Sequence, residues 1–107
     1  MSTLGTRIVE KLDTLAGFSE SPGELTRRSF TPEHRATVDQ VRTWMDAAGM
    51  HTRIDAIGNI VGRYDGEQDG PALLLGSHLD TVRNGGRFDG MLGVVLPIAV
   101  VASLAGH

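Results

Sequence analysis

The sequence contains no cysteine, which excludes disulfide bonds and thiolate metal ligands within its 107 residues. It also has no excess of basic residues, since ten Lys and Arg stand against thirteen Asp and Glu and the net charge is -3. This balance argues against binding to nucleic acid or to an anionic membrane surface. The strongly apolar stretch 91–105 contains Gly93 and Pro97 and is too short to span a bilayer, so we expect a buried helix there.

The composition is otherwise that of a folded globular chain, with 40% apolar and 21% charged residues. A length of 107 residues accommodates one domain at most. Residues 1–7 lack the apolar segment of a signal peptide, and the absence of cysteine is mildly against a small secreted scaffold. We therefore expect a cytoplasmic location.

Two helices are predicted in the first half of the chain. Hydrophobic residues at helical spacing indicate a first amphipathic helix that ends at Gly17, and residues 18–30 hold the Ser, Pro and Gly of a loop. The second helix begins at Thr31-Pro32-Glu33, where Thr31 can cap and Pro32 suits the first helical position, and it ends at Gly49. Its predicted buried stripe is Val38, Val41, Trp44 or Met45, and Ala48.

Extended segments and a third helix are predicted in the second half. Residues 52–57 and 60–64 form a hairpin around Gly58-Asn59, and residues 72–75 form a short apolar strand covered on both faces. A helix follows from Gly90. These elements predict an α/β layered domain. Because an apolar strand needs neighbours on both sides, we expect the chain to be the first part of a larger domain.

The residues that can carry chemistry follow the apolar strand: His78, Asp80 and Asp89 lie within a dozen positions. Ligands of open α/β sheets collect beyond the carboxyl ends of strands, and a neutral imidazole there suits zinc or a similar divalent ion. Asp80 would project to the same side as His78 and fix its tautomer. Asp89 follows a Gly-rich loop, and its two oxygens can bridge cations about 3.5–4 Å apart. The pattern predicts half of a two-metal hydrolytic site.

Simpler interpretations of the same residues remain open. Asp89 can cap the helix that begins near Gly90, and Gly85-Gly86 can serve a turn alone. An anion-binding loop at residues 84–90 is a weaker alternative, because the Asp89 carboxylate would repel phosphate.

The remaining histidines and arginines are predicted to lie outside the site. We expect His34 and His51 to be solvated and His107 to lie at a frayed terminus. Arg27-Arg28 is predicted to be a solvated pair, with contact to an anionic substrate as the alternative. Trp44 is expected to pack in the core or a groove.

The string GSHLDTVRNGGRFDGMLGV, with LTRRSFTPEHR, WMDAAGM and IDAIGNIVGRYDG upstream, resembles the metal-dependent amidase family of allantoate amidohydrolases and N-carbamoyl-L-amino-acid hydrolases (hydantoinase/carbamoylase type). The short Gly-Gly spacer between His78 and Asp89 is similar to this branch rather than to the related dipeptidases and acylases. The resemblance implies an α/β fold, the N-terminal part of a zinc-peptidase-like catalytic domain. Residues 1–107 would form that partial domain, and the lid and dimerisation domain would be absent.

The resemblance also implies a chemistry. His78 would ligate one of two divalent ions, zinc or manganese, Asp80 would be the catalytic residue that orients it, and Asp89 would bridge both ions. Members of the family hydrolyse a linear amide or ureido C–N bond through a metal-activated water, with a glutamate as general base. Allantoate is the favoured small-molecule substrate and an N-carbamoyl-L-amino acid the close alternative. Family members are commonly homodimers.

Two features depart from that family. The last glutamate is Glu67, and no Asp, Glu or Cys follows Asp89, so the chain would hold only a partial site. We therefore expect a truncated enzyme, or alternatively a non-catalytic fragment with a partial metal site. Leu96-Pro97 replaces small residues of the family, and Pro97 predicts a bend over residues 94–96 or a tolerated defect.

Overall fold

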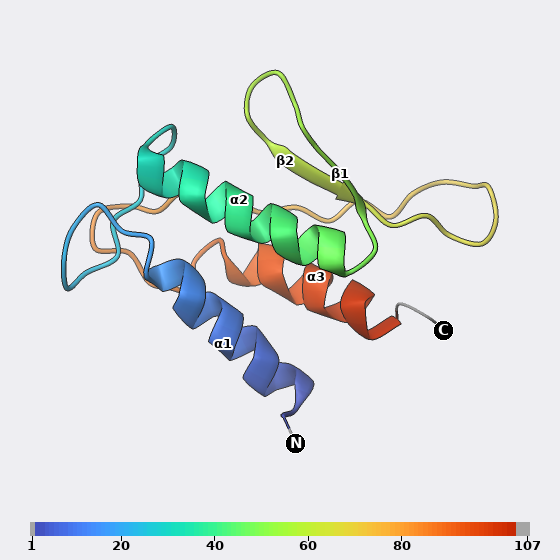
Figure 1. Cartoon of the computed structure of the whole chain (residues 1–107), viewed down its shortest axis with the longest axis horizontal. Helices are drawn as coiled ribbons and strands as arrows, with labels where there is room; N and C mark the ends of the chain where they lie inside the picture. Colours follow the sequence, from blue (N-terminus) through green and yellow to red (C-terminus); the bar gives the residue numbers. More distant parts are fainter. Residues whose placement is uncertain (1, 105–107) are drawn as a thin grey trace.

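Three helices and one β-hairpin make up the described part of the chain. The computed structural model describes residues 2–104 (Figure 1). In chain order its elements are α1 (Leu4–Ala16), α2 (Pro32–Ala47), β1 (His51–Ile54), β2 (Ile60–Arg63) and α3 (Leu92–Leu104). The helices lie side by side, with the hairpin beyond α2 and a long irregular segment leading back to α3. None of these helices is both long enough and apolar enough to cross a membrane.

Helix α1 forms as its sequence predicts. The Thr3 hydroxyl accepts a hydrogen bond from the backbone N–H of Thr6 at 3.1 Å and so satisfies one of the free donors of the first turn. Ile8, Leu12 and Leu15 are buried on one face, as helical spacing requires. The predicted first helix is confirmed.

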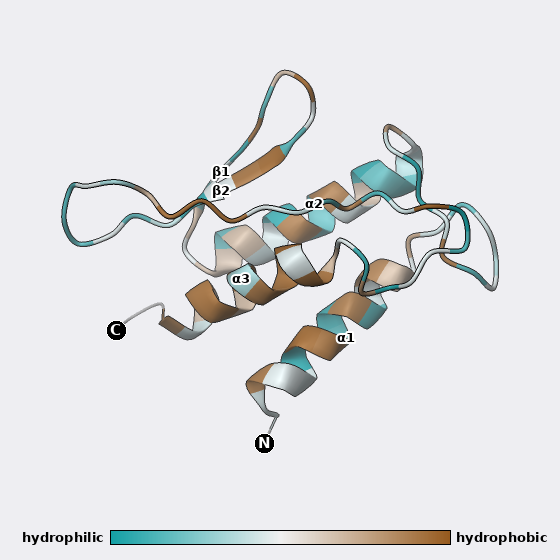
Figure 2. Cartoon of the chain, turned by 180° about the vertical axis from the view of Figure 1, so that it is seen from behind, coloured by the Kyte–Doolittle hydropathy of each residue, from teal (hydrophilic) through white to brown (hydrophobic). Residues whose placement is uncertain are grey.

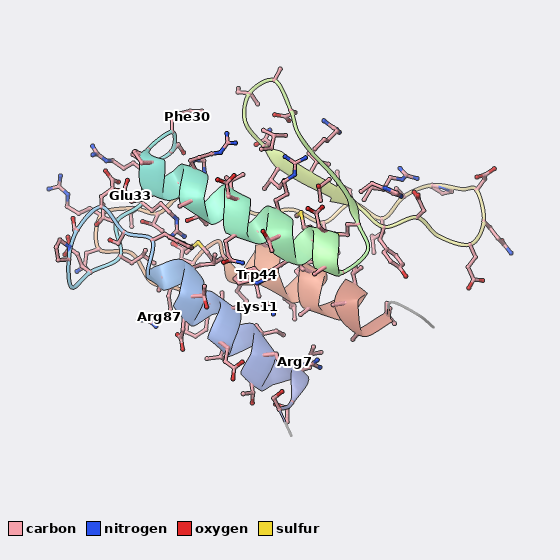
Figure 3. All side chains as sticks on the ribbon, viewed as in Figure 1. Arg7, Lys11, Phe30, Glu33, Trp44 and Arg87 are labelled. Carbon is pink, nitrogen blue, oxygen red and sulfur yellow. The ribbon has the colours of Figure 1, made fainter. Side chains whose placement is uncertain are left out.

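Helix α2 also has the predicted start and end. Thr31 Oγ1 accepts from the N–H of His34 at 3.1 Å, Pro32 occupies the first turn, and Gly49 adopts φ +87° just past the helix. Of the two alternatives for the buried stripe, Met45 is buried and Trp44 is half-buried. Figure 3 shows Trp44 beside Lys11 of α1, whose Nζ lies 5.2 Å from the ring centroid.

Helix α3 completes the core. Figure 2 shows it apolar over most of its surface, which is typical of a helix buried inside a larger protein. It contacts both α1 and α2. Its buried residues Val95, Ile98 and Ala99 join Met91, and together they meet the buried faces of α1 and α2. Pro97 lies inside α3, and the helix is uninterrupted over residues 94–96, where the sequence predicts a bend.

The hairpin is shorter than predicted in its first strand. β1 and β2 pair antiparallel, with His51 opposite Arg63 and Ile54 opposite Ile60. Asp55 begins the turn, because its carboxylate accepts from the N–H groups of Ile57 at 3.1 Å and Asn59 at 2.8 Å. These bonds end the strand at Ile54, whereas hydrophobicity alone extends it to residue 57.

The predicted strand at residues 72–75 is wrong for the described chain. Leu73, Leu74 and Leu75 are 86%, 91% and 60% exposed, and the segment has no strand assignment. Among residues 2–104 the sheet has two strands, so this segment has no neighbour to accept or donate its backbone hydrogen bonds. The α/β class is confirmed, but without a buried strand.

Candidate metal site

The segment that carries the site lies against the loop between α1 and α2. The N–H of Thr81 donates to the carbonyl of Arg27, and that of Gly85 donates to the carbonyl of Leu25, each at 2.7 Å. The N–H of Arg27 in turn donates to Thr81 Oγ1 at 2.9 Å. The two segments are far apart in sequence, and these bonds fix their register.

A salt bridge holds the Gly-rich loop to α1. Arg87 Nη1 lies 2.6 Å from Asp13 Oδ1, and Figure 3 shows Arg87 beside that helix. Both side chains are about half exposed, so this pair orients the loop and contributes little to stability. Asn84 adopts φ +51° in the same loop, a left-handed conformation that asparagine tolerates better than most residues.

His78 has a defined ring orientation. Its Nδ1 lies 2.8 Å from the backbone carbonyl oxygen of Asp80, and because a carbonyl only accepts, Nδ1–H is the donor. In the neutral ring Nε2 then carries a free lone pair, and it faces Asp89 Oδ1 at 3.9 Å. The Asp80 carboxylate is farther from Nδ1, at 3.5 Å. The tautomer is therefore fixed by the main chain of Asp80 more closely than by its side chain.

Asp89 stands at the start of α3 without capping it. Its side chain is 72% exposed, and within residues 2–104 its carboxylate accepts no backbone hydrogen bond. The first turn is closed instead by the carbonyl of Phe88, which accepts from the N–H of Leu92 at 3.1 Å. The carboxylate of Asp89 thus remains available to a ligand.

Gly90 is a site residue that sequence reasoning missed. Its φ is +84°, and a Cβ at this position would lie 2.7 Å from His78 Nε2 and overlap the ring. The imidazole therefore packs directly on the Gly90 backbone. The signal in the sequence was the Asp89-Gly90 pair, which is typical of a turn and does not reveal the close approach.

The other titratable residues differ in part from expectation. Arg27 is fully buried, so its predicted solvation is wrong, whereas Arg28 is exposed and pairs with Glu20 at 2.7 Å. His34 is half-buried rather than solvated, and its Nδ1 accepts from the N–H of Phe30 at 3.2 Å. His51 is exposed as predicted. The expectation for His107 lies outside the described residues.

The donor set fits part of a divalent-metal site. His78 Nε2 and the Asp89 oxygens are ligand types that zinc and manganese accept, and both are open to solvent. Residues 2–104 contain no group of three or more His, Asp or Glu side chains that could hold a metal ion. A structural zinc site uses about four ligands, so these two donors account for one side of it.

Comparison with known proteins identifies relatives of this chain. No family model matches it. It is 43% identical over 105 residues to an N-carbamoyl-L-amino acid amidohydrolase of Geobacillus stearothermophilus, covering 96% of this chain and 26% of that protein. It is 41% identical over 97 residues to allantoate deiminase 1 of Glycine max, covering 90% of this chain and 20% of that protein.

Solved structures give the same relationship. A hydantoinase/carbamoylase family amidase from Burkholderia ambifaria superposes with a TM-score of 0.87 and 38% identity, over 94% of this chain and 25% of that one. AtUAH in complex with glyoxylate superposes with a TM-score of 0.89 and 34% identity, over 97% of this chain and 25% of that one. The chain thus spans about a quarter of the length of these relatives. By sequence and by fold, this chain is similar to one part of the allantoate and N-carbamoyl-L-amino-acid amidohydrolases and of the hydantoinase/carbamoylase family amidases.

Proposed function

We propose that this chain supplies one side of the metal site of an amidohydrolase that cleaves a linear amide or ureido C–N bond. The observation that carries the proposal is the pairing of His78 Nε2 with Asp89 Oδ1 at 3.9 Å, with Nδ1 held by the Asp80 carbonyl. An imidazole whose second nitrogen is fixed by a hydrogen bond is the usual form of a metal-ligating histidine. Residues 1–107 then belong to the catalytic domain, and the further ligands come from outside the described residues.

The substrate we favour is allantoate, with an N-carbamoyl-L-amino acid as the close alternative. Both possibilities follow from the names of the relatives, among which an allantoate amidohydrolase of Escherichia coli is 42% identical over 90 residues. Both substrates present a ureido carbonyl, so the same half-site can serve either. We also propose a cytoplasmic location and, from the resemblance to this family, a homodimer.

Each site residue has a defined part in this proposal. His78 offers its Nε2 lone pair, Asp89 offers one or both oxygens, and Asp80 keeps Nδ1 protonated so that Nε2 stays free. Bound zinc or manganese would polarise the substrate carbonyl and lower the pKa of a water. No glutamate follows Glu67 in the sequence, so we assign no general base within this chain.

The test is ammonia release from allantoate, and cleavage of an N-carbamoyl-L-amino acid, by the full chain with added zinc or manganese. Turnover above background that is lost in His78→Ala and kept in His51→Ala supports the proposal. His51 is a matched control, because it is also exposed and also lies beside a carboxylate, Asp65, at 3.4 Å. Turnover that is equal in both variants would contradict it.

A non-catalytic role with a partial metal site is the second candidate. It is favoured because residues 2–104 contain no group of three or more His, Asp or Glu side chains placed to hold a metal ion. Metal binding that depends on His78 without any turnover would assign this role to residues 1–107 by themselves.

A further inference from the structure

Arg27 is buried in a way that its sequence position does not predict. Its relative exposure is 0%, and its guanidinium donates to three main-chain carbonyls. Nε donates to the carbonyl of Leu79 at 2.9 Å, and Nη1 donates to those of Leu15 at 2.7 Å and Phe18 at 2.9 Å. The side chain therefore links the end of α1 to the residue between His78 and Asp80.

These carbonyls explain how the charge is tolerated. A buried guanidinium is costly unless it is hydrogen-bonded, and carbonyls at a helix C-terminus carry partial negative charge. Burial lowers the pKa of Arg27, and the negative charge of Asp80 opposes that shift. Nη2 is buried without a hydrogen-bond partner among residues 2–104.

Arg27 also holds the next peptide along the chain. The N–H of Thr81 donates to the Arg27 carbonyl, and this N–H shares a planar peptide with the carbonyl of Asp80. That Asp80 carbonyl is the acceptor for His78 Nδ1–H. Arg27 therefore fixes both peptide planes that flank the Asp80 Cα, one through its side chain and one through its main chain.

We propose that Arg27 is a positioning residue, which holds the Leu79–Thr81 backbone so that the Asp80 carbonyl selects the Nδ1–H tautomer of His78. Arg27 contacts neither the substrate nor the metal in this role. Its link to metal affinity rests on the proposed function, whereas the selection of the tautomer does not.

The test is the tautomer of His78, measured by long-range proton–nitrogen NMR of the full chain above the pH at which the ring is protonated. We expect Nδ1–H in the wild-type chain and a shift toward Nε2–H in Arg27→Lys and Arg27→Met. Arg28→Met is the matched control, because the Arg28 side chain is exposed and, within residues 2–104, its guanidinium donates to Glu20 alone, and it should leave the tautomer unchanged.

Three results would overturn the inference. They are an Nε2–H tautomer in the wild-type chain, an unchanged tautomer in a folded Arg27 variant, and the same shift in Arg28→Met. If both Arg27 variants unfold, the wild-type chain decides through the scalar coupling across the bond from Arg27 Nε–H to the Leu79 carbonyl, whose absence would refute it.

A zinc titration of the same variants separates the two proposals. We expect zinc affinity to fall about ten- to a hundredfold in Arg27→Lys, the range found when a group that orients a ligand is removed. A shifted tautomer in a chain that does not bind zinc would refute the metal site and leave the positioning role intact. An unshifted tautomer in a variant that binds zinc normally would refute the positioning role and leave the metal site intact.

Discussion

At the scale of single residues, the orientation of His78 depends on the backbone of its neighbours rather than on their side chains. The ring rests on the Gly90 backbone, and its Nδ1 is held by a main-chain carbonyl. Such supports are invisible in a list of potential ligands, because they arise from backbone geometry. The sequence predicts His78 and Asp89 as ligands and Asp80 as the residue that orients His78, but it does not reveal the roles of Gly90 and Arg27.

Gly90→Ala should disable the site without removing any ligand side chain. A left-handed conformation costs a non-glycine residue about 1–2 kcal/mol, and the new Cβ would also displace the His78 ring. We expect the free energy of unfolding to fall by about that amount and zinc affinity to fall with it. Chemical denaturation and calorimetry measure the two effects. Gly86→Ala is the control, since its Cβ would meet nothing within 4 Å; equal losses in both variants would contradict this account.

His34 should make stability depend on pH. Burial lowers its pKa from 6.5 in the folded chain, while the charge of Asp80 opposes the shift and that of Arg27 adds to it. The unfolded chain therefore binds a proton first as pH falls, and stability decreases from about pH 6.5 down to the folded-state pKa, below which it levels off. Protonation would also remove the acceptor for the N–H of Phe30.

The measurement is the unfolding midpoint of the wild-type chain and His34→Gln between about pH 5 and 8. We expect acidification to lower the unfolding midpoint less in His34→Gln than in the wild type. In His51→Gln the midpoint should fall as much as in the wild type. A decrease of the same size in His34→Gln would show that another group is responsible.

At the scale of elements, sequence prediction succeeded where the determinants are local. The cap and proline at Thr31-Pro32 and the left-handed Gly49 define α2 without reference to the rest of the chain. The apolar run Leu73–Leu75 has the composition of a strand, but a strand also needs a neighbour to pair with, and that condition is not local. Arg27 was misjudged for the same reason, since the carbonyls that allow its burial come from another element.

Pro97→Ala should stabilise α3. Proline in a helix interior removes one hydrogen bond and crowds the preceding turn, at a cost of about 3 kcal/mol relative to alanine. Some of that gain is lost with the packing of the proline ring, so we expect an increase of about 1–3 kcal/mol in the free energy of unfolding. Urea denaturation measures it, with Leu96→Ala on the exposed side as control. A decrease in Pro97→Ala would show that the ring packing outweighs the missing bond.

At the scale of the whole molecule, the chain is flat. Its extents are 46 × 40 × 18 Å, and a helix with its side chains is about 10–12 Å wide, so the core has little more than one layer of helices. Large apolar side chains consequently remain exposed, above all Leu73 and Leu74. An extended apolar segment with unpaired backbone groups is a site of self-association.

Leu74→Lys should therefore reduce self-association. The substitution places a charge at the most exposed of the three leucines and removes apolar surface. Analytical ultracentrifugation over a range of concentrations should show a smaller average mass than for the wild-type chain. Gln68→Lys adds the same charge in the neighbouring exposed loop without removing a leucine, and it should have less effect. Identical behaviour of Leu74→Lys and the wild type would refute this expectation.

The central claim is that His78 and Asp89 together offer donors to a divalent ion, and a zinc titration by calorimetry tests it most directly. We predict one bound ion in the wild-type chain, with at least about tenfold weaker binding in His78→Ala and in Asp89→Asn. His51→Ala should bind zinc as the wild type does. His51 also lies beside a carboxylate, that of Asp65, but this carboxylate already accepts a hydrogen bond from Arg63 Nε at 2.8 Å. Unchanged affinity in both His78→Ala and Asp89→Asn, or no binding by the wild-type chain, would contradict the claim.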